Sequence, residues 1–423
     1  MARTTPIIRH RAVAPALLLA GIMLVAANLR PAITAVGPLL EPIGAEAGLT
    51  AAQLGLLTAV PLLAFAAVSP LAHGLGERFG IHRTVLVALV LLLAGTLVRP
   101  LPGAAAGLWI GTFIIGAAIA LGNVLIPAVV KREFPDRMTE LTGVFSAVMG
   151  GLAALGAGLA VPLSRVPLGG GAGGWRFALG AYAVLVLPAL LVWWLWGRAG
   201  RVAPSTGSGR PAAFAGPAKL PGPGTNDDAP MARGAVWRSA VAWQVTAYMG
   251  LQALTFYVLV SWLPTVEQSY GRPAVAAGWD LMFFQLAGVV ASLLAPLTLR
   301  GRLRRIGPVV PAAGTAAAVL GLMLAPGAML LWVVVAGFFS GASLVVALSL
   351  FGLRTRTHRQ ASAVSGMAQT GGYLLAAAGP PLFGLLHDQS AGWIWPLALV
   401  LAASVLQALV GVPVGRDRYA LDG

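Results

Sequence analysis

A long apolar run near the N-terminus decides the fold: residues 12–41 read AVAPALLLAGIMLVAANLRPAITAVGPLLE. A helix needs about 20 mostly apolar residues to cross a bilayer, and this run exceeds that length. Its interior contains one charged side chain, Arg30. A charge at the bilayer centre costs roughly 2.5–3.5 kcal/mol on insertion scales. We therefore expect a transmembrane helix whose arginine is retained for a functional reason.

The composition places the whole chain in a membrane. Of its 423 residues, 58% are hydrophobic and 10% are charged, and the mean hydropathy is +0.84. Soluble domains carry about 25% charged residues. The chain contains no cysteine, which excludes disulfides, thiol nucleophiles and cysteine metal sites. We find neither a catalytic triad, nor a metal-ligand cluster, nor a phosphate loop, so we expect no enzymatic activity and no cofactor.

Apolar segments recur along the entire chain and predict an all-α integral membrane protein with twelve spans. A single long connection, 198–236, is rich in Pro, Gly, Ser and Ala and predicts a flexible linker. It divides the chain into six-helix bundles at 1–197 and 237–423. The predicted spans are 12–41, 50–76, 82–101, 106–131, 139–163, 174–197, 237–265, 276–299, 307–325, 328–353, 360–386 and 391–414.

Basic residues indicate the orientation of these spans. With both termini and the linker in the cytoplasm, 23 of the 28 Lys and Arg residues lie on that side, four lie outside, and Arg30 lies within the membrane. This bias is typical of cytoplasmic loops in a plasma membrane of the bacterial type. The net charge of +15 therefore reflects topology, and we expect no nucleic-acid partner.

The two halves contain related segments. SPLAHGLGERFG at 69–80 matches APLTLRGRLRRIG at 295–307, and TGVFSAVMGG at 142–151 resembles VSGMAQTGG at 364–372. A parallel six-plus-six repeat places a solute site near the bilayer midplane between the halves.

These features resemble the major facilitator superfamily, whose loop between its second and third helices reads roughly G-x-L-x-D-R-x-G-R-K. Here 73–82 reads HGLGERFGIH, which keeps the Leu, the acid as Glu77, Arg78 and the second Gly. His73 replaces the first Gly, and Arg83 comes one place late. The resemblance implies two bundles that rock about a central site, a functional monomer, and gating by Glu77, Arg78 and Arg83, together with the loop at 300–305.

Two further segments are similar to the cyanate and 2-nitroimidazole porter branch of that superfamily. They are NLRPAITAVGPLL at 28–40 and LQALTFYVLVSWLPT at 251–265. The branch implies a small anionic or polar solute, such as a cyanate-like, nitrate-like or nitrite-like anion, a small carboxylate or a nitroimidazole.

Arg30 is the strongest candidate for solute binding. It lies about 18 residues into its helix, or roughly 27 Å at 1.5 Å per residue, which is near the midplane. Its planar fork suits small oxyanions. The alternative is a structural arginine satisfied by helix carbonyls or an acid, but we expect no Asp or Glu deep in any span. Pro31 should distort this helix. Thr34 lies one turn after Arg30 and should share its face of the helix. Asn28 should either bind the solute or pack against a neighbouring helix.

Other polar side chains within the spans complete the predicted site. Each has the alternative of an interhelical hydrogen bond without a role in binding. The candidates are Asn123, Gln252, Tyr257, Gln285, Gln369 and Tyr373.

The sequence thus favours a secondary or facilitated transporter that works by alternating access. Efflux of small drugs on the same scaffold is an alternative, and a membrane sensor without transport is a further one. The coupling ion stays open, because the candidates for proton coupling lie near predicted helix ends: His73, Glu41, Asp280 and His387. The direction of transport also stays open.

Overall fold

The computed structural model describes residues 7–103, 105–169, 171–202, 235–298 and 305–420. The predicted linker at 198–236 lies mostly outside these residues. Its first residues continue helix α9 as far as Val202, and α10 begins at Ala235. The predicted gating loop of the second half, at 300–305, also lies outside them except for Arg305.

The N-terminal bundle contains the first six predicted spans. Its described elements are α1 (Ile7–Asn28), α2 (Pro31–Thr34), η1 (Gly37–Leu39), α3 (Leu40–Ala47), α4 (Ala51–Phe79), α5 (Ile81–Val98), α6 (Ala105–Glu133), η2 (Pro135–Arg137), α7 (Met138–Ser164), β1 (Pro167–Leu168), β2 (Gly171–Ala172), α8 (Gly174–Ala181) and α9 (Ala183–Val202).

The C-terminal bundle contains the other six. Its described elements are α10 (Ala235–Arg238), α11 (Ala240–Ser269), α12 (Ala274–Thr298), α13 (Val309–Leu324), η4 (Pro326–Ala328), α14 (Met329–Leu353), α15 (His358–Ser390) and α16 (Ile394–Val414).

The predicted all-α membrane fold is confirmed. Among the described residues, ten helical segments are long and apolar enough to cross a membrane, and α13 is a shorter apolar helix. The remaining predicted span is α15, a helix of 33 residues that is more polar than the others. A two-residue antiparallel pair, β1–β2, closes the glycine-rich connection between α7 and α8.

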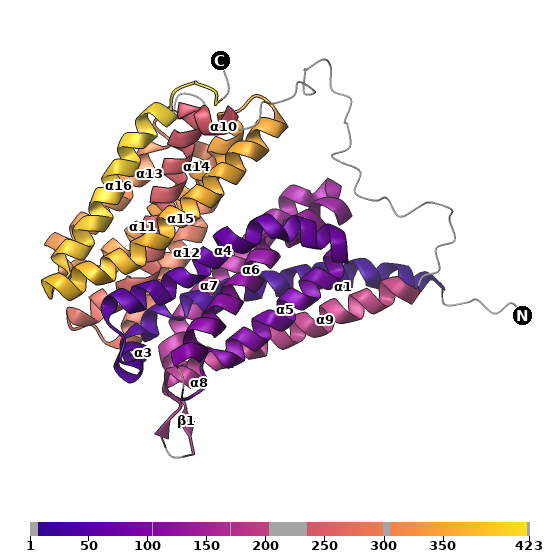
Figure 1. Cartoon of the computed structure of the whole chain (residues 1–423), viewed down its shortest axis with the longest axis horizontal. Coiled ribbons are helices and arrows are strands. Elements are labelled where there is room, and N and C mark those ends of the chain that lie inside the picture. The colour runs from indigo at the N-terminus through magenta and orange to yellow at the C-terminus, as the bar shows by residue number, and fades with distance from the viewer. Residues whose placement is uncertain (1–6, 104, 170, 203–234, 299–304, 421–423) are drawn as a thin grey trace, which may run out of the picture.

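The two bundles touch at one end and separate at the other. We call the end where α9 finishes and α10 begins the linker end, and the opposite end, with β1–β2, the hairpin end. Figure 1 shows the bundles together around α3 and diverging toward α10 in one bundle and α1 in the other.

Backbone-to-backbone contacts close the hairpin end. Gly55 of α4 faces Pro380 of α15, and Gly384 of α15 faces Ala51 at the start of α4. A Cβ atom at either glycine would overlap the backbone of the other bundle. Small residues allow helices to approach this closely in membranes, so these glycines make a tight closure possible.

A carboxylate from the C-terminal bundle adds a polar contact to this closure. Asp388 of α15 accepts hydrogen bonds from the backbone nitrogens of Ala51 and Ala52, at 3.1 and 2.9 Å. These nitrogens are the first two in α4, and helix starts leave such groups without intrahelical partners. Thr50 and Gln53 complete the start of α4 with a capping box.

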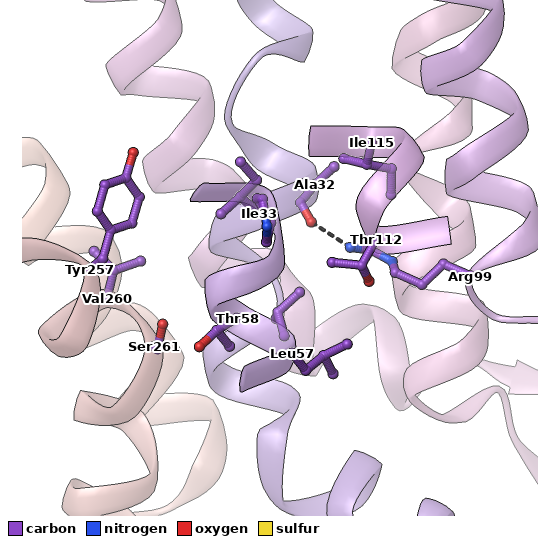
Figure 2. Close-up of a pocket in the computed structure, with 12 residues that line it drawn as sticks. Ala32, Ile33, Leu57, Thr58, Arg99, Thr112, Ile115, Tyr257, Val260 and Ser261 are labelled. Carbon is purple, nitrogen blue, oxygen red and sulfur yellow. Dashed lines mark hydrogen bonds between the residues drawn. The ribbon is translucent and has the colours of Figure 1, made fainter. Parts of the chain in front are cut away.

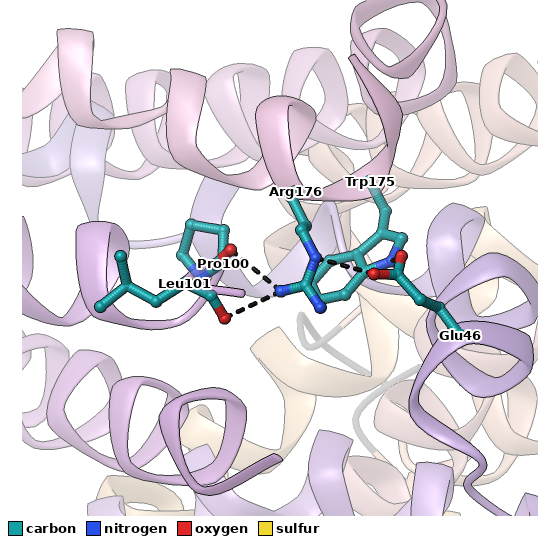
Figure 3. Close-up of polar contacts among 5 residues, drawn as sticks. All are labelled: Glu46, Pro100, Leu101, Trp175 and Arg176. Atoms are coloured by element: carbon teal, nitrogen blue, oxygen red, sulfur yellow. Dashed lines mark hydrogen bonds and ion pairs between the residues drawn. The ribbon is translucent and has the colours of Figure 1, made fainter. Parts of the chain in front are cut away.

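An arginine joins three segments of the N-terminal bundle at the hairpin end (Figure 3). Arg176 of α8 donates from Nε to the Glu46 carboxylate of α3 at 2.9 Å, and from Nη1 to the carbonyls of Pro100 and Leu101 at 3.0 and 2.9 Å. Its guanidinium also lies over the ring of Trp175. These contacts hold the hairpin ends of α3, α5 and α8 together.

Candidate functional site

The first span is broken where the sequence places Arg30. Helix α1 ends at Asn28, and the chain resumes as α2 at Pro31, whose ring cannot donate to the preceding turn. Interrupted helices occur within membranes where the freed backbone lines a cavity or meets other protein groups. The break therefore places Arg30 between two helical segments rather than along a regular helix.

Arg30 bridges the two bundles. Its Nη1 atom donates a hydrogen bond of 3.0 Å to the hydroxyl of Tyr257 on α11. Arg30 is half-buried, whereas Tyr257 is 6% exposed. Tyr373 of α15 lies near enough to both side chains to interact electrostatically. The structure thus brings together three of the predicted site residues from opposite bundles.

A cavity of about 590 Å³ lies on the linker side of these residues. Its wall is formed by α4, α6, α10 and α15, and it includes the predicted residues Gln369 and Tyr373. The ring of Tyr373 packs edge-on against Phe65, which also lines the cavity. No Asp or Glu is among the described residues that line it. The cavity is therefore polar in places but contains no anionic group to neutralise Arg30.

The predicted glutamines differ in their surroundings. Gln252 is 3% exposed and Gln285 is 8% exposed. Among the described residues, the Oε1 atom of Gln252 and the Nε2 atom of Gln285 have no hydrogen-bond partner. Gln369 is exposed to the cavity and donates to the Ser365 hydroxyl at 2.8 Å. Asn123 on α6 is half-buried. Buried amides without partners are costly, so Gln252 and Gln285 retain hydrogen-bonding capacity for a ligand or water.

Asn28 and Thr34 make structural contacts in this conformation. The Asn28 amide donates to the carbonyls of Leu24 and Leu185, at 2.8 and 2.9 Å. The Thr34 hydroxyl donates to the carbonyl of Ala153 on α7 at 2.8 Å. Both side chains therefore tie the broken span to its own bundle, because the break turns Thr34 toward α7.

The predicted gating residues lie at the linker end of α4 and α5. Glu77 is paired with His73 one turn earlier at 3.2 Å, and both side chains are largely exposed. The Arg78 guanidinium lies 5.3 Å from the centre of the Phe79 ring, and Arg83 is exposed. These contacts of Glu77 and Arg78 are made within α4.

Charged side chains at the hairpin end are more buried than the sequence indicates. Arg99, one of the four basic residues assigned to the outer side, is 1% exposed and donates to the Ala32 carbonyl of α2 at 2.7 Å. Glu267 lies just past the predicted span end at 265 and two residues before the end of α11, and it is fully buried. The Nε atom of Arg272 lies 3.6 Å from its carboxylate.

Comparisons with known proteins agree with this architecture. The sequence matches the Major Facilitator Superfamily over residues 17–333. It is 40% identical to the 2-nitroimidazole transporter of Escherichia coli (strain K12) over 402 residues, which cover 95% of this chain and 96% of the relative.

A more distant relative and a solved structure extend the comparison. The chain is 25% identical to the cyanate transport protein CynX of Escherichia coli (strain K12) over 381 residues, covering 88% of this chain and 90% of the relative. The crystal structure of a D-xylose-proton symporter has a TM-score of 0.73 at 16% identity, covering 96% of this chain and 99% of that one. The superfamily is one of transporters and not of enzymes, and this chain, a multi-pass membrane transporter, belongs to the Major Facilitator Superfamily.

Proposed function

We propose that this chain moves a small anionic or electron-rich polar solute across the membrane by rocker-switch alternating access, with Arg30 as the residue that binds it. The observation that carries the proposal is the Arg30–Tyr257 contact. It joins the two bundles beside a cavity whose described lining residues include no Asp or Glu.

The chemistry of Arg30 favours a solute with acceptor oxygens or nitrogens. A guanidinium has five N–H donors and always carries its charge, and the hydrogen bond from Arg30 to Tyr257 uses one of these donors. The others are available to a planar acceptor, which a guanidinium binds with two parallel hydrogen bonds. Gln369 and Tyr373 add neutral polar groups in the adjoining cavity.

The relatives support this class of solute. One is named for 2-nitroimidazole, which carries a nitro group, and another for cyanate, a small linear anion. Both solutes present electron-rich atoms that a guanidinium can bind. We therefore place the solute of this chain in the same class, without choosing between the two.

The uneven contact between the bundles supports alternating access. The hairpin end is closed by Gly55, Gly384 and Asp388, whereas the linker end holds the 590 Å³ cavity. With the linker in the cytoplasm, as the Lys and Arg bias indicates, this is an inward-open arrangement. Residues 1–197 and 237–423 are then the two moving halves of a functional monomer in a bacterial-type plasma membrane.

Paired measurements of binding and flux on the same purified protein test the proposal. Cyanate, nitrate, nitrite, small carboxylates and 2-nitroimidazole are screened for thermal stabilisation, and the hits are tested for uptake and release in proteoliposomes. Arg30→Ala should weaken binding by roughly 2–5 kcal/mol, the usual range when one partner of a buried charged pair is removed, and should abolish flux. Arg30→Lys keeps the charge but loses the planar fork, so it should bind less tightly than the wild type.

Arg165→Ala is the matched control, because it removes an exposed arginine beyond the end of α7. Tyr257→Phe should have a smaller effect than Arg30→Ala, since it keeps the ring and removes one hydrogen bond worth about 0.5–1.5 kcal/mol. Normal binding by a folded Arg30→Ala protein would show that Arg30 is structural. Binding without flux in the wild type would instead favour a sensor.

A further inference from the structure

Arg99 is a buried cation with unused donors. It follows the last residue of α5, its side chain is 1% exposed, and its Nη1 atom donates to the Ala32 carbonyl at 2.7 Å. Its Nε and Nη2 atoms are buried and have no hydrogen-bond partner among the described residues. An unpaired charge in the protein interior is strongly unfavourable, so these donors require an explanation beyond the contact with Ala32.

A small enclosed cavity lies beside this guanidinium (Figure 2). Its volume is about 20 Å³, enough for one water-sized particle. Figure 2 shows Arg99 and Thr112 on one side and Tyr257 and Ser261 on the other. The residues that line it are Ala32, Ile33, Val36, Leu57, Thr58, Pro61, Arg99, Thr112, Ile115, Tyr257, Val260 and Ser261.

The wall of this cavity suits an anion and not a cation. Arg99 provides the charge, and no Asp or Glu is among the lining residues. Thr58 and Thr112 donate their hydroxyl protons to carbonyls of their own helices, whereas Ser261 makes no such bond in the described part of the chain. Ser261 lies across the cavity from Arg99 (Figure 2), so its hydroxyl can donate to an anion that occupies the cavity.

The location of the cavity relates it to the solute path. Tyr257 lines it and also accepts the hydrogen bond from Arg30, so this side chain belongs to both sites. The wall comes from α2, α4 and α6 of one bundle and from α11 of the other. Because the hairpin end is closed around it, the cavity must widen when the bundles separate there.

We propose that the Arg99 cavity is a second anion site, which holds one small monovalent anion on the hairpin side of Tyr257. The inference rests on the proposed function only in placing this site on the same path as Arg30. Two sources share the required chemistry: the transported solute on its way past Arg30, and a halide that remains bound during transport.

The test measures how much sodium bromide stabilises the purified full-length protein against heat. Sodium gluconate at equal ionic strength is the comparison. The variants are Arg30→Ala, Arg99→Gln, Arg99→Lys and Ser261→Ala. We expect bromide to stabilise Arg30→Ala as it stabilises the wild type. To reach the same stabilisation, Arg99→Gln should need at least a tenfold higher bromide concentration, and Ser261→Ala a few-fold higher one. Arg99→Lys keeps the charge and should retain the response if Arg99→Gln fails to fold.

The outcomes separate the two proposals. An unchanged bromide response in folded Arg99→Gln overturns the second site, and so does an unchanged response in Ser261→Ala if Arg99→Gln is unfolded. If Arg30→Ala loses the bromide response while the Arg99 and Ser261 variants keep it, all anion binding belongs to Arg30. This result also overturns the second site. A response that depends on Arg99, in a protein whose flux does not depend on Arg30, supports the site while contradicting the proposed function. Competition between cyanate and bromide in Arg30→Ala indicates the transported solute as occupant, and its absence indicates a halide.

Discussion

The carboxylate of Asp388 should bias the protein toward closure of the hairpin end. It belongs to α15 and accepts from the backbone of Ala51 and Ala52 in α4, so its two hydrogen bonds exist only while the bundles touch there. When the bundles separate, water replaces the carboxylate at the start of α4. Asp388→Ala therefore destabilises the closed form relative to the open form and leaves each bundle unchanged.

The size of this effect follows from the type of contact. Removing a side chain that caps a helix start costs about 0.5–2 kcal/mol, and Asp388 is exposed to water. We therefore expect about 1 kcal/mol, a roughly fivefold shift toward the open hairpin end. Asp388→Asn keeps an acceptor oxygen but loses the charge that favours a helix N-terminus, so its effect should be smaller.

Cysteine labelling measures the shift, because the chain contains no cysteine of its own. Ser261→Cys reports on the hairpin side and is 6% exposed in the closed form, and Ser69→Cys reports on the cavity at the linker end. Asp388→Ala should speed labelling at 261 roughly fivefold and slow it at 69. Gln389→Ala, at the exposed neighbouring position, is the control. Equal rates in the Asp388 and Gln389 variants would refute the assignment of Asp388 as a closing contact.

Two further predictions concern the linker end. Glu77→Gln should favour the inward-open form, because Glu77 and Arg78 are expected to pair with neighbouring helix ends only when the linker end closes. Unchanged labelling at Ser69→Cys and Ser261→Cys in this variant would contradict the expectation. Tags at the N-terminus, within 205–225 and at the C-terminus should all be protected from reagents added outside intact cells, and access to the 205–225 tag from outside would reverse the proposed orientation.

The fold was predictable because hydrophobic length dominates the signal. Each predicted span coincides with a helix or a broken helix, since a bilayer requires long apolar segments with internally paired backbones. The boundaries were less predictable. Helix α11 continues four residues past its predicted end at 265, because Glu267 is tolerated in protein surroundings that the sequence does not reveal.

The site was only partly predictable, because spacing along one helix does not show what faces it from another. Arg30 and Tyr257 were both candidates, but their contact joins residues 227 positions apart and depends on how the bundles pack. Thr34 was placed with Arg30 by regular helix periodicity, and the break at Pro31 removed that relation. Arg99 lies near the end of its predicted span, 82–101, and the spacing along that span does not show that it contacts Ala32.

The broken first span gives a physical reason why solute binding and closure of the hairpin end should be linked. Arg30 precedes α2 and contacts Tyr257, while Gly37 in η1 packs against the backbone of Val260 on the same helix, three residues further on. The segment from Arg30 to Gly37 thus lies along one turn of α11, and the two contacts join the bundles side by side. A solute that draws the guanidinium away from Tyr257 removes one of these two contacts. The hairpin end is then held closed by fewer contacts, those of Gly37 and of Gly55, Gly384 and Asp388. We expect binding at Arg30 to lower the free-energy cost of separating α2 and η1 from α11, which is the movement that would expose the site to the opposite side.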